Sequence, residues 1–194
     1  MKYRSLETYV LDNETALDRP RAEYAESVGL DAPAIKVVTD LSKVAAMTIN
    51  PCASIENASE RMIAANVRLL FVTDQYYNVM GLITARDITG ERAVLYMQEH
   101  GGRRDEIMVR DIMTPRHRIE VLDYEEVLQA RVGDIVETLR RLGRQHALVM
   151  QRGEGDEMDR IRGIISTTQV SKQTGEQIDV VGLPTTIADL AAQR

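Results

Sequence analysis

The 194-residue chain lacks several features that mark whole classes of protein. It has one cysteine, no tryptophan and a single phenylalanine, and its formal net charge is −6. One cysteine cannot form an internal disulfide, so nothing in the sequence indicates an oxidising compartment. An acidic chain with few aromatic rings has neither the excess of cations that binds nucleic-acid phosphates nor the surface on which bases stack. We therefore expect no nucleic-acid partner.

Long apolar segments are missing as well. No run approaches the roughly 20 apolar residues that a membrane span needs, and the segment Met1–Glu7 has no apolar signal core. We therefore expect no membrane partner and a cytoplasmic location. The composition, with 44% hydrophobic and 28% charged residues, is that of a globular protein able to build a core.

The most informative feature that the sequence does contain is a motif that occurs twice. The segment Gly81–Ile88 corresponds to Gly163–Val170, and each copy follows a short apolar run, Leu69–Val72 or Ala147–Met150. An amphipathic stretch precedes each run. The order helix, strand, strand and helix start, given twice, predicts two copies of one supersecondary unit.

The repeat sets the expected domain organisation. We divide the chain into an N-terminal arm (1–34) with short helices around Pro20, a first repeat (35–105), a second repeat (106–175) and a C-terminal tail (176–194) with a capping helix near 185–190. Each repeat has a sheet with one face to cover, and about 60 residues bury too little surface alone. We therefore expect an α+β fold in which two βαββα repeats pack sheet to sheet about a pseudo-twofold axis, with two clefts between them.

Local signals place the helices of the first repeat. Ser54 is a suitable N-cap for a helix whose apolar residues recur at helical spacing up to Leu69. A second helix is predicted from Ala85 to about Glu99, because Gly101 follows it as a C-terminal signal.

The order of these motifs resembles the CBS domain, which is named after cystathionine β-synthase. The resemblance rests on a Met-Thr-Ile-x-Pro lead-in at 47–51, a Leu-Leu-Phe-Val-Thr-Asp strand at 69–74, a Gly-Leu-Ile-Thr-x-x-Asp turn at 81–87, and Met-Thr-Pro at 113–115. It covers roughly residues 35–174 and is to a tandem pair, or Bateman module. It implies a regulatory module, without a required cofactor, whose clefts bind an adenine nucleotide (AMP, ADP or ATP) or S-adenosylmethionine. It also implies a homodimer.

Thr84 and Asp87 have two compatible interpretations. A Thr-x-x-Asp sequence at a helix start forms a capping box, whereas the resemblance assigns Asp87 to the ribose of a ligand. Carried over by position, the resemblance predicts a first cleft, and Arg86, beside the helix N-terminus, is the candidate for a phosphate contact. Its ligand-binding residues would be Leu82, Thr84, Arg86, Asp87, Ile112, Met113, Thr114, Arg144, Gln145 and His146.

The corresponding second cleft has a different polar residue. Gln169 stands where the first copy has Asp87, and a neutral amide binds a diol more weakly than a carboxylate does. We therefore expect the Asp87 cleft to bind more tightly. The residues carried over to this second, degenerate cleft are Thr48, Val67, Arg68, Leu69, Ser166 and Gln169.

Enzymatic activity is not expected. We find no nucleophile with a neighbouring base, no Gly-rich phosphate loop and no spacing typical of metal ligands, so no catalytic or metal-binding residue is assigned. The sequence leaves two alternatives to a ligand sensor open. One is a structural dimerisation adaptor with empty clefts, and the other is a regulatory subunit that acts on an unidentified protein partner through its arm. Apolar residues on one helix, Val94, Leu95 and Met97, support dimerisation.

Overall fold

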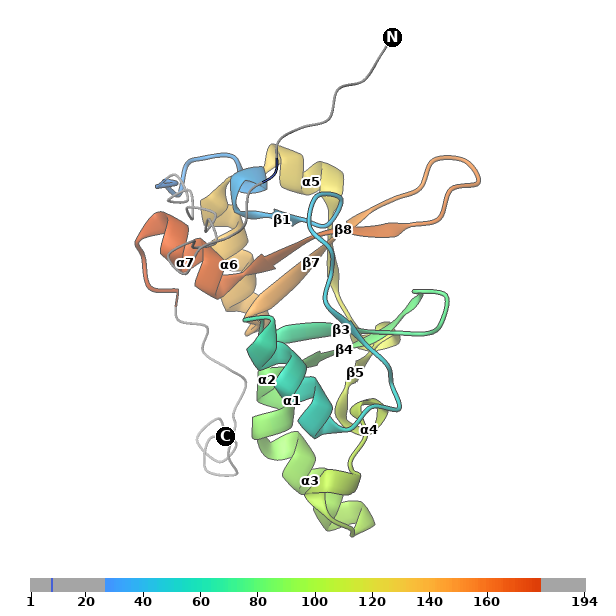
Figure 1. The fold of residues 1–194 in the computed structure, drawn as a ribbon. Coiled ribbons are helices and arrows are strands. Elements are labelled where there is room, and N and C mark those ends of the chain that lie inside the picture. Colours follow the sequence, from blue (N-terminus) through green and yellow to red (C-terminus); the bar gives the residue numbers. More distant parts are fainter. Residues whose placement is uncertain (1–7, 9–26, 179–194) are drawn as a thin grey trace, which may run out of the picture.

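The structure is a computed structural model, and it describes residue 8 and residues 27–178 of the chain. The helices expected in the arm lie almost entirely outside the described residues, and the helix expected near 185–190 lies outside them completely. Two four-stranded sheets, one above the other in Figure 1, form the centre of the molecule. Their strands are β1 (Thr39–Asp40), β2 (Thr48–Ile49), β3 (Leu69–Thr73), β4 (Val79–Thr84), β5 (Thr114–Pro115), β6 (Val121–Asp123), β7 (His146–Gln151) and β8 (Arg160–Ser166).

The sheets define two structural units. The first unit has the strand order β2-β3-β4-β5, and the second unit has the order β1-β8-β7-β6. No described helix is long and apolar enough to cross a bilayer. The helices of the first unit are α1 (Ile55–Ala64), α2 (Ala85–Thr89), α3 (Glu91–His100), η2 (Arg104–Glu106) and α4 (Val109–Ile112). Those of the second unit are η1 (Ala34–Val37), α5 (Tyr124–Gln129), α6 (Val132–Leu142) and α7 (Thr167–Thr174), with η3 (Arg116–Arg118) between the two sheets' strands β5 and β6.

Each sequence repeat gives its first strand to the other unit. Strand β1 pairs antiparallel with β8 of the second repeat, and β5 pairs antiparallel with β4 of the first. The short helices that precede these strands cross over too. Val37 of η1 is buried in the core of the second unit, and Val109 of α4 is buried in the core of the first. The two units are therefore interleaved, which couples the packing of one to that of the other.

The duplicated glycine of the sequence motif lies where the exchanged strands cross. A Cβ atom on Gly81 would stand 2.6 Å from the carbonyl oxygen of Thr114 in β5. A Cβ atom on Gly163 would collide with Val38, which directly precedes β1. Both positions thus need a residue without a side chain, because the backbone of β5 lies over Gly81 and the Val38 side chain lies over Gly163.

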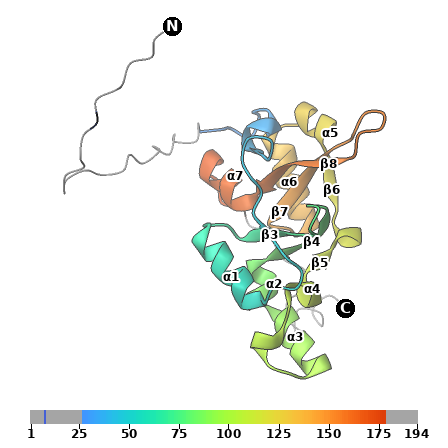
Figure 2. The ribbon, with the colours of Figure 1, turned by 45° about the vertical axis from the view of Figure 1, so that its right-hand side comes forward.

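Three apolar clusters hold the fold together. Each unit has its own core between sheet and helices, and a third cluster joins the two sheets through Leu69 and Phe71 of β3 and Leu148 of β7. Figure 2 shows α1 and α7 on the same side of the molecule, with the strands to their right. The expected sheet-to-sheet packing of two α+β repeats is therefore confirmed.

The helix predicted from Ala85 to Glu99 is in fact two helices. Helix α2 ends at Thr89 and α3 begins at Glu91, with Gly90 in an extended conformation between them. A Cβ atom on Gly90 would stand 2.5 Å from the carbonyl oxygen of Arg86, so this close turn requires glycine. The break changes the direction of the chain immediately after Asp87. By contrast, α1 begins as predicted, and the Ser54 hydroxyl accepts a 3.1 Å hydrogen bond from the Asn57 N–H.

Candidate functional site

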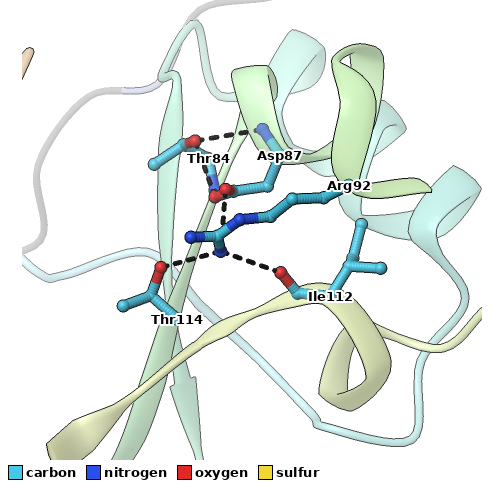
Figure 3. Close-up of polar contacts among 5 residues, drawn as sticks. All are labelled: Thr84, Asp87, Arg92, Ile112 and Thr114. Atoms are coloured by element: carbon cyan, nitrogen blue, oxygen red, sulfur yellow. Dashed lines mark hydrogen bonds and ion pairs between the residues drawn. The ribbon is translucent and has the colours of Figure 1, made fainter. Parts of the chain in front are cut away.

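Asp87 caps the helix that carries it. The Asp87 Oδ2 accepts hydrogen bonds from the Thr84 backbone N–H at 2.8 Å and from the Thr84 hydroxyl at 2.7 Å. In return, the Asp87 backbone N–H donates a hydrogen bond to the Thr84 hydroxyl oxygen at 3.3 Å (Figure 3). This reciprocal arrangement is a complete capping box. The structural interpretation of the Thr-x-x-Asp motif is therefore confirmed, and one carboxylate oxygen is fully used by it.

The other oxygen of Asp87 binds an arginine that sequence reasoning missed. Nη1 of Arg92 lies 3.0 Å from Asp87 Oδ1, and it also donates to the Thr114 hydroxyl at 2.9 Å and to the Ile112 carbonyl at 3.1 Å. Figure 3 shows the guanidinium at the centre of these groups. Four residues predicted for the first cleft, Thr84 included, are thus brought together around Arg92. In one continuous helix Arg92 would point about 140° away from Asp87 around the helix axis. The contact therefore depends on the break at Gly90, which the sequence analysis did not predict.

The remaining residues predicted for the first cleft are more scattered. Leu82 packs against the cluster between the sheets, Met113 packs against the core of the first unit, and Arg86 is exposed. Arg144 forms an ion pair with Glu120 at 3.1 Å. Among the described residues, no hydrogen bond or ion pair joins Arg144, Gln145 or His146 to Asp87.

A cavity of about 610 Å³ lies on the Gln169 side, between the two units. It is lined by residues of β3 and its approach, of β7, of the β8–α7 turn and of the 41–47 segment that connects the two sheets. The residues that matter for its chemistry are Val67, Arg68, Leu69, His146, Ser166, Gln169 and Lys172. Five of the six residues predicted for the second cleft are among them. The sixth, Thr48, lines a separate cavity of about 710 Å³ beside α1.

His146 is the residue whose placement differs most from the sequence interpretation. We grouped it with Asp87, but it lines the cavity with Gln169. The reason is that His146 in β7 is the antiparallel partner of Ser166 in β8, so it lies beside the β8–α7 turn that carries Gln169. Burial, and secondly the positive charge of Arg68, lower the pKa of His146 to about 4. The imidazole is therefore neutral at pH 7.

Gln169 is capped differently from Asp87. The Ser166 hydroxyl accepts a 3.1 Å hydrogen bond from the Gln169 N–H, as in the first repeat. Within the described part of the chain, however, the side-chain amide of Gln169 has no hydrogen-bond partner. The amide lines the cavity with both its donor and its acceptor available to another molecule.

The cavity has a positive lining in an acidic protein. Arg68 and Lys172 line it, and none of the described aspartate or glutamate residues does. Its walls also include apolar side chains, such as Met47, Phe71 and Ile164. This combination suits a ligand with a flat apolar part and an anionic part. Over residues 27–178 no group of three His, Cys, Asp or Glu side chains could hold a metal ion.

Comparisons with known proteins agree with this architecture. Residues 38–93 match the family model of the CBS domain. An uncharacterised conserved protein from Pyrococcus horikoshii superposes with a TM-score of 0.54 at 21% identity, covering 77% of this chain and 97% of that one. A CBS-domain-containing protein from Agrobacterium tumefaciens superposes with a TM-score of 0.52 at 19% identity, covering 81% and 98%. No curated protein sequence matches the chain.

Residues 38–93 therefore match a CBS domain, and the two units have the fold of a CBS-domain pair. The resemblance inferred from the sequence motifs is confirmed. Likeness at this level of identity shows the fold, and the function has to be argued from the cavity.

Proposed function

We propose that the chain is a regulatory module that binds an adenosine-containing ligand in the cavity between its two units. The observation that carries this proposal is the cavity itself. It is lined by both units, and it contains the amide of Gln169, which no described residue binds. A ligand held there touches both sheets and the 41–47 connection at once. Its binding would favour one packing of the units over another, which is the thermodynamic requirement for a regulatory effect.

The lining favours an adenine nucleotide over S-adenosylmethionine. The apolar walls can hold a purine, and the Gln169 amide can bind a ribose hydroxyl. Arg68 and Lys172 then remain for phosphate groups, which bind guanidinium and ammonium groups strongly. S-adenosylmethionine carries a sulfonium cation, and no described carboxylate lines the cavity to balance it. We therefore place AMP, ADP and ATP ahead of S-adenosylmethionine.

Calorimetric titration with AMP, ADP, ATP, S-adenosylmethionine and NAD tests the proposal. We expect a phosphate-bearing adenine nucleotide to bind, and the variants Arg68→Gln and Gln169→Ala to bind it at least about tenfold more weakly. The matched control is Arg103→Gln, because Arg103 is an exposed arginine paired with exposed Asp105 at 2.9 Å. Binding that is unchanged in Gln169→Ala would place the ligand elsewhere, and no binding by any of the five compounds would refute the proposal.

One observation favours a second candidate, a structural dimerisation adaptor. Both oxygens of Asp87 are occupied by Thr84 and Arg92, so this cleft needs no ligand to satisfy its polar groups. An adaptor would show no ligand in the titrations and would still bind a partner. Capture of partners with the full chain and with a chain lacking residues 1–34, each with and without nucleotide, separates an adaptor from a regulatory subunit. Only the latter should bind its partner in a nucleotide-dependent manner.

A further inference from the structure

We propose that Arg92 is a built-in occupant of the Asp87 cleft, and that this cleft is closed in the ligand-free protein by the chain's own guanidinium. The inference rests on the proposed function only for the choice of probe. Nη1 of Arg92 contacts Asp87 Oδ1, the Thr114 hydroxyl and the Ile112 carbonyl within 3.1 Å. These are groups from three separate elements, and all three residues are ones that the family pattern assigns to a ligand.

The contacts engage both oxygens of the carboxylate. Oδ2 accepts hydrogen bonds from the backbone N–H and the hydroxyl of Thr84, and Oδ1 forms an ion pair with Arg92. The Asp87 side chain is 13% exposed, so a ribose hydroxyl can reach Oδ1 only if the guanidinium leaves. The apparent affinity of this cleft is then the intrinsic affinity multiplied by the fraction of molecules in which Arg92 is displaced.

Displacement of Arg92 is physically accessible. Its side chain is 49% exposed, so the guanidinium can move into water without first breaking a packed core. Its attachment also depends on the turn at Gly90, which directs the first turn of α3 back toward Asp87. Arg92 is thus held by charge and hydrogen bonds at the surface, and such contacts weaken as ionic strength rises.

The second repeat provides an internal comparison. Thr174 stands five residues after Gln169, as Arg92 stands five residues after Asp87. The Thr174 hydroxyl donates to the Val170 carbonyl of its own helix at 3.0 Å and does not enter the cleft. The cleft on that side contains the 610 Å³ cavity. The two clefts are built from equivalent strands and helix starts. The Asp87 cleft, which has an arginine at this position, is occupied by it, and the Gln169 cleft, which has a threonine there, is open.

The decisive test counts ligand sites. We would titrate the parent, Arg92→Ala and the double variant Arg92→Ala with Asp87→Asn with AMP in a calorimeter. The parent should bind one AMP per chain. Arg92→Ala should bind a second AMP, with a gain of at least about tenfold in affinity at the Asp87 cleft, and the double variant should lose it. Arg103→Ala, which removes an exposed arginine on the same unit, should keep the parent stoichiometry. Arg92→Gln, which retains a polar side chain, guards against a folding defect and should also expose the second site.

A ligand-free measurement separates this inference from the proposed function. Urea unfolding of the parent, Asp87→Asn, Arg92→Ala and the double variant gives the coupling between the two residues. If neither the parent nor any variant binds AMP or another panel nucleotide, the proposed function fails. The Arg92 contact is then judged by the coupling energy alone: a clear coupling supports it, and no measurable coupling refutes it. If the parent binds one nucleotide and Arg92→Ala gains none, Arg92 is only a structural tie and the inference is wrong.

Discussion

Arg68 and His146 line the same cavity, and the positive charge of Arg68 adds to burial in keeping His146 uncharged. Together they lower the pKa of His146 to about 4. His146 is the first residue of β7 in the second unit, and Arg68 directly precedes β3 in the first unit. The relationship therefore spans the contact between the two units.

The stability of the protein should fall between pH 6.5 and pH 4. In the unfolded chain His146 takes up a proton near pH 6.5, whereas in the folded protein it does so only near pH 4. Its lowered pKa thus costs no stability above pH 6.5, and the free energy of unfolding declines by up to about 3 kcal/mol as the pH falls through this window. Below pH 4 this residue has no further effect. Urea unfolding at a series of pH values measures the decline.

His146→Gln should flatten that profile, because glutamine does not titrate. His117→Gln is the matched control, since His117 is exposed in η3 and its loss should leave the decline in place. An equally steep profile in His146→Gln would mean that other groups cause it.

Substituting either duplicated glycine should destabilise the fold. Alanine at Gly81 would bring a Cβ atom to 2.6 Å from the Thr114 carbonyl, and alanine at Gly163 would collide with Val38. Relief requires the backbone of β5 to move at Gly81 and Val38 to shift at Gly163, and overpacking of this kind typically costs about 1–3 kcal/mol. Thermal unfolding measures the cost.

Gly133→Ala provides a control in which the expected change in stability is zero or favourable. Gly133 lies inside α6, where the nearest atom to an added Cβ would be 3.5 Å away. Alanine is a better helix former than glycine by about 1 kcal/mol, so this variant should be as stable as the parent or more so. If Gly81→Ala and Gly163→Ala were equally neutral, the strand crossings would not be as tight as the structure shows.

The sequence predicted the parts of the fold that depend on local chemistry. The Ser54 cap, the buried strand Leu69–Thr73 and the stop at Gly101 follow from side-chain type and spacing over a few residues. The duplicated motif also predicted two packed repeats. Strand exchange was not predicted, because β1 is only two residues long and its partner β8 lies more than 100 residues away.

The candidate site was predictable in its members but less so in their grouping. Ser166, Gln169 and Arg68 could be named from the repeat, and they do line one cavity. The contact of Arg92 with Asp87 could not be named, because it depends on the direction of α3 after Gly90. The location of His146 depends on the register of β7 with β8, in which His146 is paired with Ser166.

We expect the protein to be a homodimer. Val94 and Leu95 are exposed on α3, which projects from the end of the first unit in Figure 1. Large apolar side chains exposed on one helix favour a self-complementary contact. Light scattering at micromolar concentration should therefore give the mass of two chains, and Leu95→Glu should reduce it to one. Met158→Glu, at an exposed apolar residue in the β7–β8 turn, should leave the dimer intact. A parent that is monomeric under these conditions would contradict the expectation.

The relative strength of the two clefts is tested by Asp87→Asn and Gln169→Ala. The sequence alone predicts that Asp87→Asn loses most of the ligand-induced stabilisation, because a charged acceptor is lost. The structure favours the opposite ranking, since Arg92 already occupies Asp87 while the Gln169 amide faces a cavity.

A ligand at about one hundred times its dissociation constant stabilises the folded state by roughly 2.7 kcal/mol, which is a rise of about 5–11 °C in Tm for a chain of this size. Gln169→Ala should lose most of that rise. Asp87→Asn should keep it, yet melt about 2–8 °C lower without ligand, because its cap and its ion pair with Arg92 are weakened. If Asp87→Asn instead melts like the parent and loses the ligand-induced rise, the Asp87 cleft is the ligand site and the cavity beside Gln169 is not.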